Sequence, residues 1–153
     1  MYIHKILTPE LIIYPLEART RDEVITALVE RLYEEKLITN PDATRQAVID
    51  RENLMTTGVG KGVALPHGKS ADITEVLVSA GVAVEGIDFQ AVDAQPVQIF
   101  VLLLTPERYP SKHLKLLSKF SRMLNNAQCR DEILQATSSK EIAQILYKYD
   151  TQS

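Results

Sequence analysis

The 153-residue chain has 17 Lys and Arg against 20 Asp and Glu, a formal charge of −3 at pH 7, and 45% hydrophobic residues. This composition is typical of one globular domain, and its acidic balance argues against binding to nucleic acid or to an anionic membrane surface. The single cysteine excludes an intrachain disulfide framework. No stretch has the length of a membrane span and no signal-peptide pattern is present, so we expect a cytoplasmic protein without membrane insertion.

Two helices are predicted in the first third of the chain. Residues 20–23, Thr-Arg-Asp-Glu, form a capping-box pattern, and hydrophobic residues at helical spacing extend this helix to about Lys36. Asn40 followed by Pro41 is a second start signal, with the asparagine as N-cap and the proline in the first helical position. The second helix is expected to end near Glu52.

Three strands are predicted in the middle of the chain, over Val63 to Leu65, 76–84 and 97–104. The second run is rich in β-branched residues, which favour strands. The third is a nearly continuous apolar run, VQIFVLLL, and this pattern suits a strand that is buried on both faces. The pattern does not indicate whether the strands are parallel or antiparallel.

Helices return after two prolines. The first is expected to begin near Ser111, a short one to cover about 128–135, and the last to begin at the capping box of residues 138–141. Cys129 is expected between helical segments. The buried stripe predicted for the first of these helices comprises Leu114, Leu117, Ser121 and Leu124, and that predicted for the last comprises Ile142, Ile145 and Leu146. Helices at both ends around central strands predict a sheet covered by helices.

The segment GVGKGVALPHGKS, residues 58–70, has the glycines and the Gly-Lys-Ser ending of a phosphate-binding loop. A Walker A loop needs its first glycine at position 63, where this chain has valine, and a dinucleotide fingerprint needs glycine or alanine there. Pro66 also removes a backbone N–H from the segment, although N–H groups are what binds phosphate in such loops. The segment is therefore not a nucleotide-binding loop.

His67 is the chemically active side chain of this segment. Pro66 restricts the backbone before it, and Gly68 has no Cβ, so another molecule can approach the ring closely. A neutral imidazole keeps one nitrogen lone pair free for attack, and such a nitrogen can accept a phosphoryl group. The alternative is a histidine that fills a turn, and the segment by itself leaves both interpretations open.

Residues 58–68 resemble the phosphorylation-site motif of the type 2 EIIA domains of the bacterial phosphoenolpyruvate-dependent sugar phosphotransferase system, in its fructose and mannitol branch and its nitrogen-related branch. The resemblance extends over nearly the whole chain, so that 1–153 is expected to be one such domain. The further similar segments are TRDEVITALVERL, DRENLMTTGVG, IDFQAVDAQPVQIFVLLLTPE and HLKLLSKFSRML. The resemblance implies an α/β fold of a single domain, with a mixed central sheet flanked by helices on both faces.

The resemblance also implies roles for individual residues. His67 would be the phosphorylated residue, with phospho-HPr as donor, an EIIB domain or a regulated target protein as acceptor, and no cofactor. His113 matches the family's second histidine, which can donate a hydrogen bond to phosphoryl oxygens. Arg51 matches its arginine, whose guanidinium suits phosphate. Without the resemblance, both would be interpreted as solvated residues near helix ends. The further phosphate-contacting candidates are Thr57, Gly68 and Lys69.

Two other functions are weighed. A metal-dependent hydrolase built on His67 and His113 would need a third ligand, and no His or Glu lies at a ligand-like spacing, so no metal is expected. A regulatory protein, in contrast, would use the same phosphorylation site. Because of the His-Gly-Lys sequence and the free-standing length, the nitrogen-type regulator is preferred. The alternative is a free-standing EIIA subunit of a fructose- or mannitol-type transporter.

Overall fold

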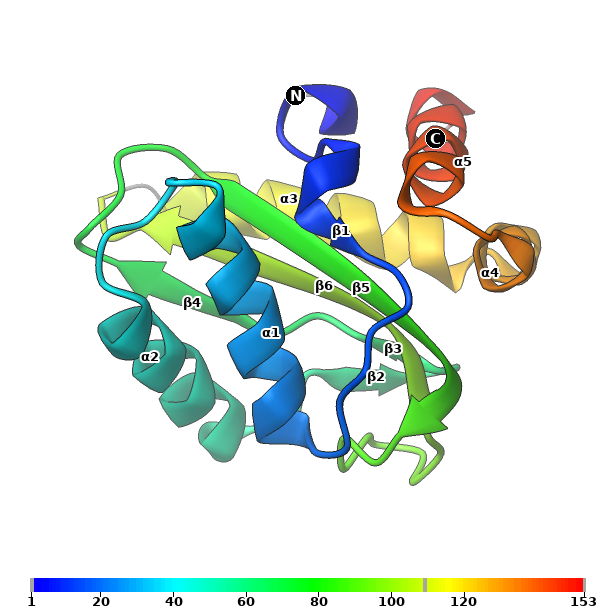
Figure 1. Ribbon diagram of the computed structural model, residues 1–153, viewed down its shortest axis with the longest axis horizontal. Coiled ribbons are helices and arrows are strands. Elements are labelled where there is room, and N and C mark those ends of the chain that lie inside the picture. The colour runs from blue at the N-terminus through cyan, green and yellow to red at the C-terminus, as the bar shows by residue number, and fades with distance from the viewer. Residues whose placement is uncertain (1, 109, 153) are drawn as a thin grey trace.

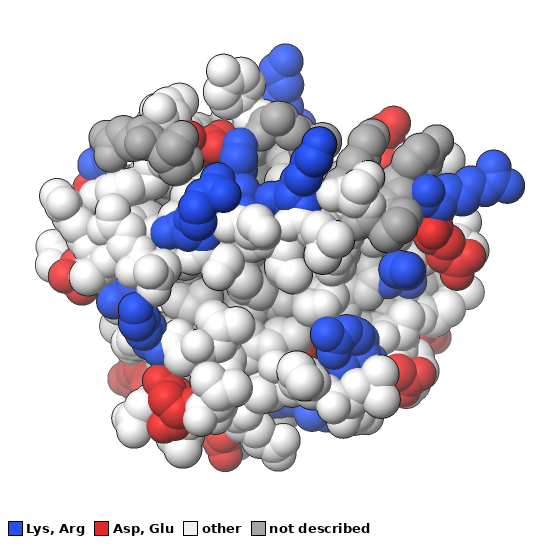
Figure 2. Space-filling view, turned by 180° about the vertical axis from the view of Figure 1, so that it is seen from behind, with Lys and Arg blue, Asp and Glu red and all other residues white. Residues whose placement is uncertain are grey.

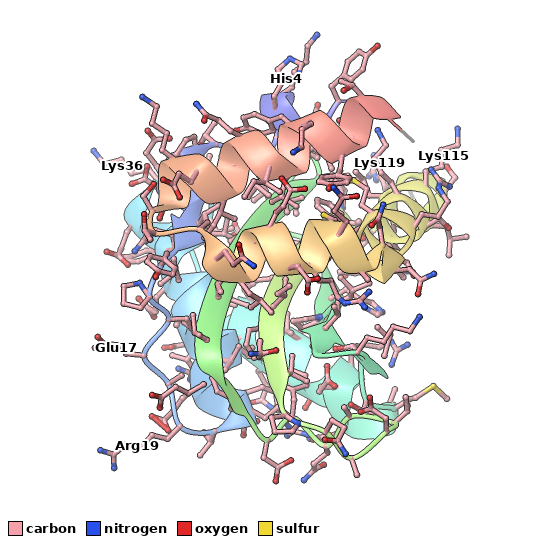
Figure 3. The ribbon with its side chains drawn as sticks, turned by 90° about the vertical axis from the view of Figure 1, so that its right-hand side faces the viewer. His4, Glu17, Arg19, Lys36, Lys115 and Lys119 are labelled. Atoms are coloured by element: carbon pink, nitrogen blue, oxygen red, sulfur yellow. The ribbon has the colours of Figure 1, made fainter. Side chains whose placement is uncertain are left out.

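The computed structural model describes residues 2–108 and 110–152, which form one α/β domain around a six-stranded mixed sheet (Figure 1). The elements in chain order are η1 (Ile3–Lys5), η2 (Pro9–Leu11), β1 (Ile12–Ile13), α1 (Arg21–Glu34), α2 (Pro41–Leu54), β2 (Gly58–Gly60), β3 (Val63–Ala64), β4 (His67–Ser70), β5 (Leu77–Ile87), β6 (Val97–Pro106), α3 (Pro110–Asn125), α4 (Ala127–Gln135) and α5 (Ser139–Gln152). Helices α1 and α2 cover one face of the sheet and α3 covers the other. Helices α4 and α5 pack beside α3, and α5 also contacts η1 and η2 (Figure 3). This architecture confirms the expected fold class.

The predicted N-terminal signals of three helices are present. Thr20 accepts a hydrogen bond from the backbone N–H three residues on, at 3.2 Å, and Asn40 does the same at 3.1 Å with Pro41 opening α2. Ser138 accepts the corresponding bond at 3.1 Å before α5. Each such cap stabilises a helix by about 1 kcal/mol. Helix α2 continues to Leu54, slightly beyond the predicted end.

The buried face of α3 agrees only in part with the predicted stripe. Leu124 is buried and Leu117 packs, partly buried, against the core, whereas Leu114 is 64% exposed and Ser121 faces solvent. Among the residues of the helix whose side chains are described, Leu116, Phe120 and Met123 are buried as well. These are larger apolar side chains than Ser121, so their burial removes more apolar surface from water.

The central pair of strands is β5 and β6, which are antiparallel. Every residue of β6 except Gln98 is buried, as predicted for a strand covered on both faces. On its other side β6 pairs in parallel with β3, where Val63 lies opposite Ile99, and then with β4, where His67 lies opposite Leu103. Residues 63–70 therefore run beside β6 as one interrupted strand.

The interruption at Pro66 places His67 in a strand. The carbonyl oxygen of Pro66 accepts from the Leu103 N–H at 3.0 Å, and the ladder then continues with His67 as the first residue of β4. The interpretation of His67 as a residue that fills a turn is therefore wrong. Strand β4 was not predicted because its sequence, HGKS, has no alternation of apolar and polar residues.

The turn between β2 and β3 has three consecutive residues with positive φ, at Gly60 (99°), Lys61 (60°) and Gly62 (78°). Glycine adopts this region without steric cost, and here it flanks a lysine that does so under strain. The Lys61 N–H donates to Asp93 Oδ2 at 3.0 Å, and its Nζ donates to Asn125 Oδ1 at 2.6 Å. The turn is thus held to the C-terminal end of α3.

Cys129 lies inside α4 and not between helices. Asn126 caps this helix by accepting from the N–H groups of Gln128 and Cys129, which starts the helix before the cysteine. The thiol is free and buried, and this burial raises its pKa to about 11. Cys129 is therefore an unreactive part of the core.

Candidate functional site

His67 presents one nitrogen to its own backbone and leaves the other free. The partly buried ring places Nδ1 2.8 Å from the carbonyl oxygen of Leu65. A carbonyl oxygen can only accept, so the hydrogen bond requires the proton on Nδ1. The neutral ring then carries its lone pair on Nε2, which is the nitrogen able to attack an electrophile.

His113 comes from the first turns of α3 and lies against His67. The ring centroids are 4.7 Å apart and the planes meet at 64°, in an edge-on contact. Nδ1 of His113 lies 3.4 Å from Oγ1 of Thr105, which is fully buried at the end of β6. Strand β6 thus supports both rings, through its pairing with β4 and through Thr105.

Both imidazoles are held in the neutral form. Burial lowers the pKa of His67 below its usual range; the bond to Leu65 opposes this shift, the positive charge of Arg51 adds to it, and the negative charge of Glu52 opposes it. Burial also lowers the pKa of His113 to about 4, and the electrostatic effects of His67, Lys69 and Arg51 add to this shift. At neutral pH the site therefore offers a free lone pair at His67 and one N–H donor at His113.

Two cationic side chains act on these rings. Arg51 is in the last turn of α2, and Lys69 is exposed on β4. Within the described residues, 2–108 and 110–152, neither side chain has a hydrogen-bond or ion-pair partner. Both are therefore available to an anion, and the planar guanidinium of Arg51 can bind two phosphoryl oxygens at once.

The wider face around α3 is also basic. The sequence of α3 contains four lysine and arginine residues and no acidic one. Figure 2 shows this face, where Lys and Arg side chains gather across the upper part while most of the visible Asp and Glu side chains lie nearer the margins. A positive local field attracts an incoming phosphorylated group even though the net charge of the chain is negative.

Thr57 and Gly68, two further candidates from the sequence, have other partners in this structure. Thr57 is buried and donates both its N–H and its hydroxyl to Glu52. A Cβ on Gly68 would lie 3.2 Å from Cγ2 of Val48, so the glycine permits close packing of α2 on β4. The contact of either residue with a phosphoryl group stays a prediction.

Sequence reasoning missed Glu52. This side chain is only 3% exposed, next to Arg51, and it receives both hydrogen bonds of Thr57. A signal for its burial exists, because Thr44, Val48 and Glu52 follow each other at intervals of four and share the inner face of α2. That interval is obscured by the many charged residues around it.

The described part of the chain contains no group of three or more His, Cys, Asp or Glu side chains that could hold a metal ion. Among the same residues, no helix is long and apolar enough to cross a membrane.

Comparison with known proteins gives consistent matches. The chain is 32% identical to the fructose-specific EIIA component of Haloferax volcanii over 92% of both chains, and 30% identical to the nitrogen regulatory protein of Bradyrhizobium diazoefficiens over 95% of both. The crystal structure of nitrogen regulatory protein IIA-Ntr from Neisseria meningitidis superposes with a TM-score of 0.88 at 28% identity, covering 94% of this chain and 98% of that one. The chain is also 29% identical, over 98% of its length, to the fructose-specific EIIABC component of Bacillus subtilis, of which it spans 24%.

The model of one protein family, described as the phosphoenolpyruvate-dependent sugar phosphotransferase system, EIIA 2, matches residues 5–149. That range includes every strand of the sheet and both histidines of the site. It agrees with the resemblance carried by the Pro-His-Gly segment. The chain therefore belongs to the type 2 EIIA family of this phosphotransferase system.

Proposed function

We propose that this chain is a phosphohistidine carrier whose His67 accepts a phosphoryl group from phospho-HPr and passes it to an EIIB domain, or holds it as a signal to a regulated protein. The observation that carries the proposal is the 2.8 Å hydrogen bond between His67 Nδ1 and the Leu65 carbonyl oxygen. This bond leaves Nε2 unprotonated and ready for attack at neutral pH.

In the transfer step, the Nε2 lone pair forms a bond to phosphorus. The bond between phosphorus and the donor atom breaks, and its electron pair stays on the donor. The ring of His67 keeps the Nδ1 proton and gains a positive charge, which the Leu65 carbonyl stabilises through their hydrogen bond. Transfer to the acceptor reverses these changes and restores the neutral ring.

The surrounding side chains stabilise the negative charge on the phosphoryl oxygens. Neutral His113, whose ring lies edge-on against His67 with centroids 4.7 Å apart, would donate a hydrogen bond from its N–H to a phosphoryl oxygen. Arg51 from α2 and Lys69 from β4 supply positive charge. Catalysis of phosphoryl transfer depends mainly on positioning the reacting groups and stabilising charge, and these side chains contribute to both.

The comparisons support both fates of the phosphoryl group. The Bacillus subtilis relative contains its EIIA part within an EIIABC component, which favours an EIIB domain as acceptor. The likeness to IIA-Ntr of Neisseria meningitidis favours the nitrogen-type regulator, our preferred branch. A phosphoryl group adds a charge of about −1.5 to −2, which is enough to change how a partner binds.

Incubation with phosphoenolpyruvate, enzyme I and HPr tests the carrier function. We expect one acid-labile phosphate on His67, and complete loss of labelling in His67→Ala. His4→Ala is the matched control, because His4 is exposed and lies outside the site. Labelling that survives intact in His67→Ala would contradict the proposal.

Growth of a deletion strain on fructose and on mannitol tests the branch. Loss of growth on one sugar, restored by the wild-type gene and not by His67→Ala, would show a transporter subunit instead of a regulator. Normal growth on both sugars is the expected result.

A further inference from the structure

Four hydrogen bonds connect a buried carboxylate to the reactive imidazole. The N–H and the hydroxyl of Thr57 donate to the two oxygens of Glu52, at 2.5 and 2.7 Å. The carbonyl oxygen of Thr57 accepts from the Leu65 N–H at 3.0 Å. The carbonyl oxygen of Leu65 then accepts from Nδ1 of His67 at 2.8 Å. Glu52 thus fixes Thr57, Thr57 bonds to Leu65, and Leu65 bonds to His67.

The contacts of Glu52 suit a carboxylate. Both of its oxygens accept hydrogen bonds from Thr57, and an ionised carboxylate is an acceptor only. It is 3% exposed, and across residues 2–108 and 110–152 it forms no ion pair. Burial of a carboxylate without a cation is costly, and a neutral side chain would fill the same space without that cost. A role in packing alone does not account for the charge.

We propose that Glu52 is a positioning residue for phosphoryl transfer: through Thr57 and Leu65 it keeps His67 in the tautomer that carries the proton on Nδ1 and the lone pair on Nε2. The transfer readout of this proposal rests on the proposed function of His67, whereas the tautomer readout does not.

The charge of Glu52 adds a second effect in the same direction. Among the described residues, Arg51 and Glu52 from α2 act electrostatically on His67, and His113 from α3 lies against its ring, with Lys69 of β4 acting on His113. Glu52 is the negative one, and it raises the pKa of His67 against the effects of burial and of Arg51. During attack the ring becomes positive, so a nearby anion stabilises that state more than the starting one.

The test compares Glu52→Gln with Asp50→Asn. Glutamine keeps the size of Glu52 and removes its charge, while Asp50 is an exposed acid on the same helix whose side chain bonds only to Gln46 in the described structure. In Glu52→Gln, we expect the ¹⁵N shifts of the unphosphorylated His67 ring to report a mixture of tautomers and a lower pKa. Transfer from phospho-HPr should slow about tenfold, as when an outer partner of a positioned histidine is lost. Asp50→Asn should behave as wild type.

A variant of Thr57 separates positioning from folding. Thr57→Val loses the hydroxyl bond to Glu52 and should show a smaller tautomer shift and rate loss than Glu52→Gln. If Glu52→Gln fails to fold, Thr57→Val decides the question. Lower stability with an unchanged tautomer and rate in these variants would overturn the proposal. A tautomer shift in a protein whose wild type takes no phosphoryl group would contradict the carrier function alone.

Discussion

Two buried carboxylates at opposite regions of the molecule are compensated in different ways. Asp150 in α5 is 6% exposed; its Oδ2 accepts from the Ile3 N–H at 2.8 Å, and its Oδ1 lies 2.8 Å from Nζ of Lys119 in α3. Figure 3 shows Lys119 where these two helices meet. Glu52 is equally buried and accepts from Thr57 instead, a neutral residue. The charge of Asp150 is therefore neutralised by a lysine, whereas Glu52 has only hydrogen bonds from a neutral side chain and its backbone.

The difference separates stability from chemistry. The ion pair of Asp150 joins the N-terminal segment, α3 and α5, far along the chain from each other, so its loss should loosen the fold. The bonds of Glu52 stay within the segment that leads to His67. An uncompensated charge beside a reacting ring changes the energy of each charge state of that ring. We therefore expect variants near His67 to change the transfer rate with little change in stability, and variants of Asp150 to change stability with little change in the transfer rate.

The largest expected effect in this comparison is on transfer, at His113. His113→Ala removes the donor beside His67 and should slow transfer in both directions roughly 10²–10³-fold, as loss of one preorganised donor does in other enzymes. Stability at neutral pH should change little, because His113 is only partly buried. Rapid-quench measurement of transfer from phospho-HPr checks this, and a wild-type rate in both directions would rule out the role.

The next largest effect is on stability, at Asp150. Asp150→Asn keeps an acceptor for Ile3 and removes the charge opposite Lys119, so the free energy of unfolding should fall by about 2 kcal/mol. Transfer should be unaffected. Urea titration provides the measurement. The control is Asp42→Asn, which breaks the exposed pair with Arg45 and should cost under about 1 kcal/mol. Equal losses in both variants would show that the buried ion pair of Asp150 contributes no more to stability than the exposed pair of Asp42.

The last effect is the response of stability to acid. The pKa of His113 is about 4 in the folded chain, below its ordinary 6.5, so the unfolded state binds more protons between these values. The free energy of unfolding should therefore fall as pH falls from about 6.5 to about 4. His113→Asn should make this fall shallower, whereas His4→Asn should not. An identical pH dependence in wild type and His113→Asn would show that the ring is not held neutral by the fold.

Local signals in the sequence predicted the frame of the molecule well. The caps at Thr20, Asn40 and Ser138 are short-range hydrogen bonds, and β6 is marked by its apolar run. Strand β4 had no such mark, because what makes HGKS a strand is its pairing with β6. The buried face of α3 could not be predicted for the same reason, because it depends on which row of side chains packs against the sheet.

The candidate site also contains residues that the sequence could predict and residues that it could not. Residue chemistry pointed to His67, and its partnership with His113 came from family resemblance, since the two residues meet only through the pairing of β4 with β6 and the start of α3 beyond it. Glu52 could not be identified by charge alone, because its function depends on Thr57 and Leu65, whose hydrogen bonds exist only in the folded chain.

The burial of Cys129 has a practical consequence for studying partner docking. Its thiol is enclosed in α4 and its pKa is about 11, so at neutral pH it is almost entirely in the unreactive thiol form. A maleimide probe should therefore label only a cysteine introduced elsewhere, with no need to remove the native one. Leu54, which is 82% exposed at the end of α2 just after Arg51 and Glu52, is a suitable place for a fluorophore that senses the arrival of a phosphorylated partner.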